Sequence, residues 1–211
     1  MKILVTGFNG KIGYSVAEKL KKNHLPIVCA VRNVEKANQK FGDQYEFVQL
    51  DLTQPDTFHN ALTNVDKIFL NYPPADNIQF EEFIKTAKEC GVKHVVYLSV
   101  KDVQFLPFIH HHKNEQLIKK YNIPYTFLRA GYFMQNLNDF LLKEIKENRR
   151  IFVPAGKGKT SFVDTRDIAE IAMICLKDIS KHMNKKYTIT VILRQENRHR
   201  FFYRAFAWWP S

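Results

Sequence analysis

The chain has 211 residues, a formal net charge of +11, and 45% hydrophobic and 25% charged residues. This composition is typical of a globular protein with a full core, and no window approaches the roughly 20 consecutive apolar residues that cross a membrane. The positive charge is spread along predicted helices, which indicates solvated faces and argues against a nucleic-acid surface. The first residues enter an apolar run and the three cysteines lie far apart, so we expect a cytoplasmic protein without a signal peptide or disulfides.

The first predicted strand and helix carry the most informative pattern. Residues 3–13 read ILVTGFNGKIG, a β-branched run followed by three glycines and a helix. Gly7 allows a tight turn, Gly10 lets backbone N–H groups approach a pyrophosphate, and Gly13 lets the helix pack close to the strand. The helix N-terminus adds partial positive charge for phosphates. The pattern favours a dinucleotide-binding loop over an ordinary turn with incidental glycines.

Apolar runs and helical patterns then alternate along the chain. Further strands are predicted at 27–31, 45–50, 67–70, 94–99 and 125–128. Helices are predicted at 34–40, 56–62, 79–90, 114–121 and 133–147, with a last helix from an N-cap at Asp164 or Thr165 to Lys177. This alternation predicts an α/β fold, a Rossmann-like doubly wound parallel sheet with helices on both faces. A glycine-bearing turn at 155–159 is either a surface turn or a phosphate contact.

The end of the second predicted strand indicates which dinucleotide binds. NAD-binding folds commonly place a carboxylate there, whereas this chain has Arg32. A guanidinium can bind a 2′-phosphate in a fork, so Arg32 favours NADP(H) over NAD(H), the alternative being a surface arginine that ends a strand. Asp51 follows the third strand and is placed to accept a hydrogen bond from an adenine amino group. Its alternative role is in a turn or an N-cap.

Several segments together resemble the NmrA-like branch of the atypical short-chain dehydrogenase/reductase family. They are VTGFNGKIG at 5–13, VRN at 31–33, LDLT at 50–53, YLS at 97–99, IPYTFLRAGYFMQN at 123–136 and FVDTRDIA at 162–169. The resemblance covers about residues 1–190. It implies an NAD(P)-binding Rossmann domain over 1–150 and a reduced C-terminal substrate part, with a remnant over 151–190 that completes the fold. Residues 191–211 form an atypical tail.

The resemblance also implies which residues bind the cofactor. They are Thr6, Gly7, Asn9, Gly10, Lys11, Ile12, Gly13, Arg32, Asp51, Leu52, Asn71, Tyr72, Pro73, Ser99, Gly131, Tyr132 and Phe133.

The chain departs from the family at the catalytic positions. The family's Tyr-x-x-x-Lys pair falls on Pro107 and His111, while its serine is present as Ser99. A Tyr-x-x-x-Lys string at 97–101 lies on a strand and its exit, where this spacing does not bring two side chains together. The catalytic candidates are therefore Ser99, His111 and Tyr132. His111 would hydrogen-bond the nicotinamide ribose or donate a proton, or it is an exposed imidazole at a helix start.

No metal site is expected, because the consecutive histidines at 110–112 diverge by about 100° per residue on a helix. The resemblance implies an NADPH-dependent oxidoreductase that transfers hydride to a small planar acceptor, such as a quinone or an azo or triarylmethane dye. The alternative is a non-catalytic NADP(H)-binding redox sensor that acts through a protein partner, and a homodimer stays open. From residue 191 the chain lacks lysine and holds both tryptophans. Either the reading frame departs there from an ancestral one, or this is a genuine basic and aromatic segment.

Overall fold

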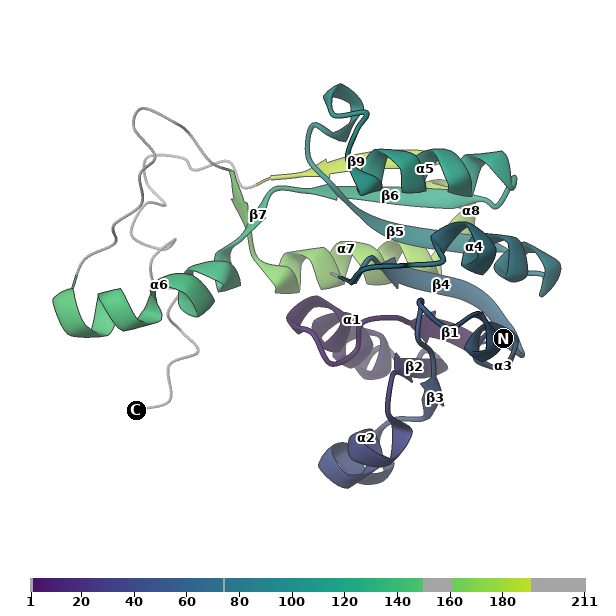
Figure 1. The fold of residues 1–211 in the computed structure, drawn as a ribbon, viewed down its shortest axis with the longest axis horizontal. Coiled ribbons are helices and arrows are strands. Elements are labelled where there is room, and N and C mark those ends of the chain that lie inside the picture. Colours follow the sequence, from purple (N-terminus) through teal and green to yellow (C-terminus); the bar gives the residue numbers. More distant parts are fainter. Residues whose placement is uncertain (1, 74, 150–160, 191–211) are drawn as a thin grey trace.

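A seven-stranded parallel sheet forms the centre of the molecule (Figure 1). The computed structural model describes residues 2–73, 75–149 and 161–190. The strand order is β3-β2-β1-β4-β5-β6-β9. The strands are β1 Lys2–Val5, β2 Ile27–Val31, β3 Phe47–Gln49, β4 Val65–Asn71, β5 His94–Val100, β6 Tyr125–Ala130 and β9 Lys185–Ile189. The predicted Rossmann-like parallel sheet is therefore confirmed.

Helices cover both faces of this sheet. One layer holds α1 Lys11–Lys22, α2 Val34–Phe41 and α7 Thr165–Lys177. The other holds α3 Phe58–Leu62, α4 Phe80–Glu89 and α5 His110–Lys120. Short helical elements are α8 Ile179–His182, η1 Gly42–Gln44, η2 Pro55–Thr57 and η3 Val103–Phe105. The longer helices α1, α4 and α7 bury an apolar stripe against the strands, as the alternation of the sequence predicts.

The central strand β1 shows why a continuous apolar run forms this sheet. Ile3 and Val5 pack into the core on the α1 and α7 side, whereas Leu4 packs into the core on the α3 and α4 side. Successive side chains of a strand point to opposite faces, so a strand covered on both faces is apolar at every position. All three residues are buried.

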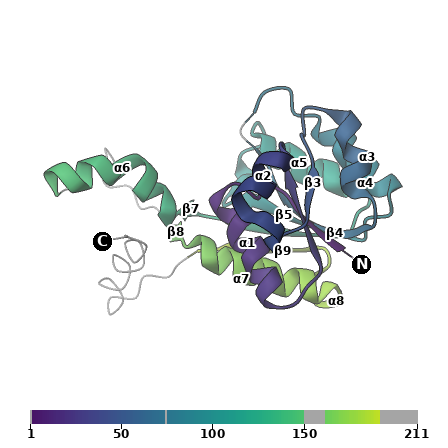
Figure 2. The same ribbon diagram turned by 90° about the horizontal axis from the view of Figure 1, so that it is seen from below.

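A second, two-stranded sheet lies next to the start of the helix α6 Met134–Asn148, outside the seven-stranded sheet. β7 Tyr132–Phe133 pairs in parallel with β8 Phe162–Val163. The helix α6 follows β7 and projects away from the seven-stranded sheet at the carboxyl ends of its strands (Figures 1 and 2). The predicted turn at 155–159 and the tail at 191–211 lie outside the described residues.

The edge strand β9 and the start of α5 illustrate where the structure differs from the sequence-based expectation. The edge strand β9 pairs in parallel with β6 but was not predicted, because Lys185, Lys186 and Thr188 are exposed and interrupt any apolar run. The helix α5 begins at His110, four residues before the predicted start at 114, because its polar first turn shows no helical period. In both cases tertiary pairing decides the structure where the hydrophobic pattern is weak.

A buried histidine at the amino end of β5 makes the stability of this fold pH-dependent. His94 is fully buried, and its Nε2 lies 2.9 Å from Thr126 Oγ1. The Thr126 hydroxyl donates to the His182 carbonyl at 2.8 Å, so His94 is the donor in its own bond with Thr126. Burial, and then the nearby charge of Lys67, lowers the pKa of His94 to about 4. The folded chain therefore holds this imidazole neutral.

We predict that the free energy of unfolding falls by about 2 kcal/mol between pH 8 and pH 5 because of His94. The unfolded chain takes up a proton at the ordinary imidazole pKa of 6.5, whereas the folded chain resists until about pH 4. Stability is therefore lost as the pH falls through this window. Urea unfolding at a series of pH values measures the slope. His94→Gln should reduce it, while His59→Gln, a change at an exposed histidine, should not; equal slopes in all three proteins would contradict the prediction.

Candidate functional site

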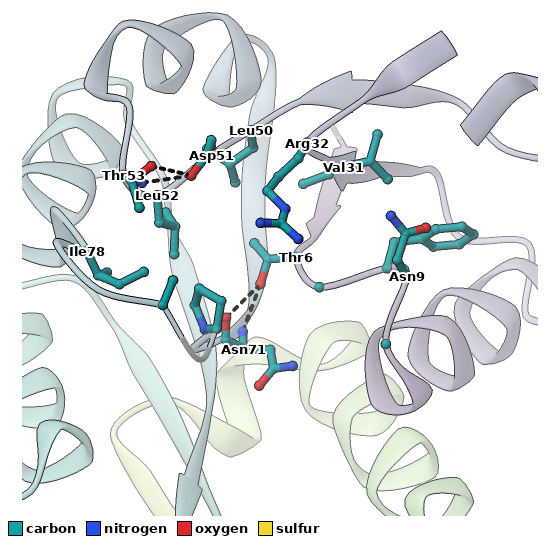
Figure 3. Close-up of a pocket in the computed structure, with 16 residues that line it drawn as sticks. Thr6, Asn9, Val31, Arg32, Leu50, Asp51, Leu52, Thr53, Asn71 and Ile78 are labelled. Atoms are coloured by element: carbon teal, nitrogen blue, oxygen red, sulfur yellow. Dashed lines mark hydrogen bonds between the residues drawn. The ribbon is translucent and has the colours of Figure 1, made fainter. Parts of the chain in front are cut away.

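A cleft of about 350 Å³ lies at the carboxyl ends of β1, β2, β3 and β4 (Figure 3). The chain turns to β2 on one side of β1 and to β4 on the other, so the cleft occupies the point where the strand order reverses. Its lining consists of Thr6, Gly7, Phe8, Asn9, Gly10, Ala30, Val31, Arg32, Leu50, Asp51, Leu52, Thr53, Asn71, Pro73, Ala75 and Ile78. The structure thus brings together predicted cofactor residues from four separate segments.

The glycine loop packs its backbone directly against helix α1. Gly7 has φ +65°, and its carbonyl accepts a hydrogen bond from the Gly10 N–H at 2.9 Å. A Cβ on Gly13 would lie 2.1 Å from Gly7 O, so only glycine permits this approach. A Cβ on Gly10 would meet only Gly7 O, at 3.3 Å, and Gly10 lines the cleft. The loop therefore has the shape of a cradle into which a phosphate can approach the start of α1.

A cluster of aromatic rings holds the same loop in place. Phe8 is fully buried and contacts Tyr14, Phe41, Tyr45 and Phe47, with ring centroids 4.9–5.6 Å away. Edge-to-face and tilted contacts of this kind are favourable arrangements of aromatic rings. Sequence reasoning missed this residue, although its aromatic ring inside a glycine-rich loop was a visible signal. The buried Phe8 ring anchors the glycine loop to the core, while the loop itself lines the cleft.

Arg32 supplies the positive charge of the cleft. It follows β2 directly, is exposed, and extends across the cleft toward Thr6 (Figure 3). Within the residues that the structure describes, its guanidinium forms no hydrogen bond or ion pair. A guanidinium left without an acid partner beside a helix N-terminus is suited to binding an anion in a two-pronged contact.

Asp51 takes the turn role that was its alternative interpretation. Its Oδ1 accepts hydrogen bonds from the Thr53 N–H at 2.9 Å and from the Thr53 hydroxyl at 2.8 Å. Asp51 and Leu52 nevertheless line the cleft. Within the part of the chain that the structure describes, only Oδ1 of Asp51 accepts hydrogen bonds. A contact between Asp51 and an adenine amino group stays a prediction.

The exit of β4 forms the opposite wall of the cleft. The Asn71 N–H donates to Thr6 Oγ1 at 2.8 Å, which ties β4 to the end of β1. Pro73 also lines the cleft, but Tyr72 does not. The Tyr72 ring stacks on His110, with centroids 5.6 Å apart, and meets His111 edge-on at 5.9 Å. Tyr72 therefore links the cofactor-side loop to the start of α5.

The structure places Ser99, one of the catalytic candidates, in a buried ionic network. The Ser99 hydroxyl donates to Glu115 Oε1 at 2.8 Å. Arg129 grips the same carboxylate with two bonds, Nε to Oε1 at 3.0 Å and a terminal nitrogen to Oε2 at 2.6 Å. A third bond joins Arg129 to Gln104, in η3. Breaking a buried pair like this one is strongly destabilising, so this network first of all joins β5, α5 and β6.

The second catalytic candidate, His111, belongs to a different cluster. His111 Nδ1 lies 2.8 Å from the hydroxyl of Tyr97, a fully buried side chain on β5. The Asn114 side chain donates to the same hydroxyl at 3.0 Å. Burial lowers the pKa of His111 below its usual value. Lys101 instead pairs with exposed Asp102, so Tyr97 and Lys101 do not act as a pair, as the sequence predicts.

The third candidate, Tyr132, lies on β7 outside the cleft. Its ring is 47% exposed and meets Phe162 edge-on at 5.7 Å. Gly131 is required just before it, because a Cβ there would lie 2.4 Å from Ser161 O. Lys11 donates to the Gln135 carbonyl at 3.0 Å, which joins the start of α1 to the start of α6. The predicted residues of β7 therefore do not line the cleft. They lie next to the start of α6, which Lys11 joins to the start of α1.

The remaining predicted residues and the histidine run are placed as follows. Ile12 is buried on α1, and Phe133 is partly buried against the same core. Nδ1 of His112, the last histidine of the run, lies 3.2 Å from the Val103 carbonyl, whereas His110 stacks on Tyr72 and His111 is hydrogen-bonded to Tyr97. The described part of the chain contains no group of three metal-ligating side chains and no helix that could cross a membrane.

Comparison with known proteins agrees with this geometry. The family model described as NmrA-like matches residues 1–192. The NAD(P)H azoreductase of Xenophilus azovorans is 34% identical over 196 residues, which cover 89% of this chain and 67% of that protein. The triphenylmethane reductase of Citrobacter sp., solved as a complex with NADP(H), is 31% identical with a TM-score of 0.80, covering 90% of this chain and 70% of that one. The NADPH-dependent quinone oxidoreductase of Escherichia coli, complexed with NADPH, is 27% identical with a TM-score of 0.77, covering 90% and 69%.

The chain spans about two thirds of the length of the curated relatives it matches, from 62% to 67% among those with the strongest similarity. The match nevertheless includes the glycine loop, the end of β2 and the segments at 123–136 and 162–169. A family model that matches residues 1–192 and a relative at 34% identity decide the assignment. The chain therefore belongs to the NmrA-like family.

Proposed function

We propose that this chain binds NADP(H) and transfers hydride from NADPH to a small planar acceptor, a quinone or an azo or triarylmethane dye. The observation that carries the proposal is Arg32, whose guanidinium lies over the cleft without an acid partner among the described residues. A 2′-phosphate is the group that distinguishes NADP from NAD, and arginine is the side chain best suited to hold it.

The shape of the cleft supports a dinucleotide in a defined direction. The glycine loop and the start of α1 would hold the pyrophosphate, since Gly10 leaves the backbone accessible there. Arg32 would hold the 2′-phosphate, and apolar Leu52 and Ile78 would flank the adenine. The nicotinamide would then extend past Asn71 toward α5 and β7. Strand ends and the glycine loop line the adenosine half of this site, and a preorganised lining favours tight binding.

The class of acceptor is inferred from the absence of the family's tyrosine base at its usual position. When bound, reduced nicotinamide supplies the hydride, and the protein must orient the acceptor and exclude water. Oxidation of an alcohol requires a base at its hydroxyl. In this chain the family's tyrosine position holds Pro107, and the Ser99 hydroxyl donates its hydrogen to Glu115. Reduction of a quinone or dye needs no such base. The names of the related azo-dye, triphenylmethane and quinone reductases agree with this choice.

The test is steady-state oxidation of NADPH by the purified chain with a quinone, an azo dye and a triarylmethane dye, each measured separately. We expect turnover that depends on both the acceptor and the folded protein, and faster turnover with NADPH than with NADH. Tight NADPH binding without turnover of any of the three acceptors would overturn the reductase proposal and favour a redox sensor that acts through a protein partner. Absence of binding would overturn both.

A further inference from the structure

The side chains of Tyr97, His111 and Asn114 form a hydrogen-bonded cluster centred on the Tyr97 hydroxyl. His111 and Asn114 lie three residues apart on α5 and therefore on the same face of the helix. Both reach the hydroxyl of Tyr97, at 2.8 Å and 3.0 Å. Tyr97 is fully buried on β5, so water cannot replace either partner.

The positions of the hydrogens follow from the chemistry of these groups. The Asn114 NH₂ group can only donate, so the Tyr97 oxygen accepts from it. The single hydrogen of the Tyr97 hydroxyl then has one available acceptor, His111 Nδ1. A buried hydroxyl hydrogen without a partner is strongly unfavourable. A neutral imidazole that accepts at Nδ1 carries its own hydrogen on Nε2.

The surroundings of His111 favour the neutral ring. Burial and the neighbouring His110 lower the pKa of His111, while Glu115 acts in the opposite direction. The Glu115 carboxylate is itself held by Arg129 and by Ser99, which offsets its charge. Tyr97 and Tyr72, the other groups against the ring, are phenols that are uncharged at neutral pH, and burial raises the pKa of both further.

Building on the proposed reductase function, we propose that Tyr97 and Asn114 are positioning residues that hold His111 in its Nε2–H tautomer. The His111 ring meets Tyr72, which lies between the cleft-lining residues Asn71 and Pro73. From this position at the edge of the cleft, His111 is a fixed, neutral hydrogen-bond donor toward the oxygen of the bound acceptor. His111 Nε2 makes no hydrogen bond within the described part of the chain, whereas Nδ1 is occupied. A neutral histidine can polarise an acceptor oxygen in this way without giving up its proton.

The same geometry excludes His111 as the source of the proton at neutral pH. To release its Nε2 proton, the ring would have to take the Tyr97 proton at Nδ1 and leave a buried phenolate. Burial raises the pKa of Tyr97 strongly, which opposes this step. In the balanced reaction a quinone gains a hydride from NADPH and one proton from water, and becomes a hydroquinone. His111 begins and ends the reaction with the same single proton.

The first test is NMR on the cofactor-free chain with ¹⁵N-labelled histidine at pH 7. Two-bond correlations between ring nitrogens and carbon-bound protons distinguish the two neutral tautomers and the imidazolium. The His111 signals are those that disappear in His111→Gln. We expect the Nε2–H tautomer; an Nδ1–H tautomer or an imidazolium at pH 7 would overturn the proposal. The measurement needs no turnover, so it stands or falls separately from the reductase function.

The second test is kinetic. We expect His111→Ala to lower kcat with a quinone by about 100-fold at nearly unchanged KM for NADPH, as for the loss of one fixed donor. His111→Gln should recover part of this loss, because its amide can donate. Tyr97→Phe should produce a mixture of tautomers and a kcat about tenfold lower. Tyr121→Phe, which removes a phenol hydroxyl from the exposed end of α5, is the matched control.

The pH profile separates the two roles of His111. A hydrogen-bond donor gives a kcat that is flat from pH 6.5 to pH 9, since the neutral ring persists throughout. A proton donor gives a kcat that falls across the same range, because the protonated fraction of His111 shrinks as the pH rises above its pKa. A falling profile that His111→Gln abolishes would overturn the proposal, as would a Tyr97→Phe protein that keeps the pure Nε2–H tautomer.

Discussion

Replacing Gly13 by alanine is expected to destabilise the fold and to weaken cofactor binding strongly, although alanine has the higher helix propensity. Gly13 lies inside α1, where alanine is favoured over glycine by about 1 kcal/mol on helix propensity. The new Cβ, however, would lie 2.1 Å from Gly7 O and 2.8 Å from the Phe8 N–H nitrogen. Both are backbone atoms of the loop and cannot rotate away. We expect a net loss of about 3 kcal/mol in the free energy of unfolding, measured by urea titration.

The same substitution should weaken NADPH binding by more than 100-fold, because α1 can move away from Gly7 only by opening the phosphate cradle. Gly10→Ala is the matched control. Its Cβ would meet only Gly7 O, at 3.3 Å, so the fold should persist within about 1 kcal/mol, while binding weakens because the methyl group narrows the cleft. If Gly13→Ala stabilised the chain, helix propensity would outweigh the contact and the close approach would not be essential.

Much of the fold could be predicted because its strands are buried on both faces. In β1 the run Ile3, Leu4 and Val5 is apolar because both faces of the strand are covered, and the glycines mark the turn that follows. The edge strand β9 gives no such signal. Lys185 and Lys186 face solvent, and pairing with β6 forms a strand from residues with little preference of their own. Contacts between distant segments therefore supply what the local pattern lacks.

The candidate site divides in the same way. The glycine loop and Arg32 follow strand ends, and the geometry of parallel sheets gathers strand ends at one edge. Side-chain partners are not available from a sequence. Ser99 could be aligned with the family's serine, but its bond to Glu115 depends on where α5 crosses β5. Likewise, the sequence gives no partner for the Tyr97 hydroxyl, because the contact with His111 depends on the packing of α5 against β5. Sequence patterns place backbones, whereas packing selects which side chains meet.

Arg32→Glu is expected to reverse the cofactor preference. Loss of a charge-assisted pair with the 2′-phosphate weakens NADPH binding by roughly 30-fold, about 2 kcal/mol. The introduced carboxylate repels that phosphate further, and it can accept hydrogen bonds from the 2′-hydroxyl of NADH. Together these effects should shift the ratio of the two affinities toward NADH by about 1,000-fold. Parallel titrations with NADPH and NADH, followed by fluorescence, measure both dissociation constants.

Two controls separate a specific contact from the general positive field of a chain with net charge +11. Arg32→Ala should lower NADPH affinity and leave NADH affinity nearly unchanged, because it removes one contact without adding another. Lys22→Ala removes an equal charge from the exposed end of α1, away from the glycine loop, and should change both affinities by less than about twofold. If Lys22→Ala weakened NADPH as much as Arg32→Ala, long-range attraction would explain the preference. A contact at Arg32 predicts instead that the NADPH deficit of Arg32→Ala persists at high salt, where attraction between distant charges is screened.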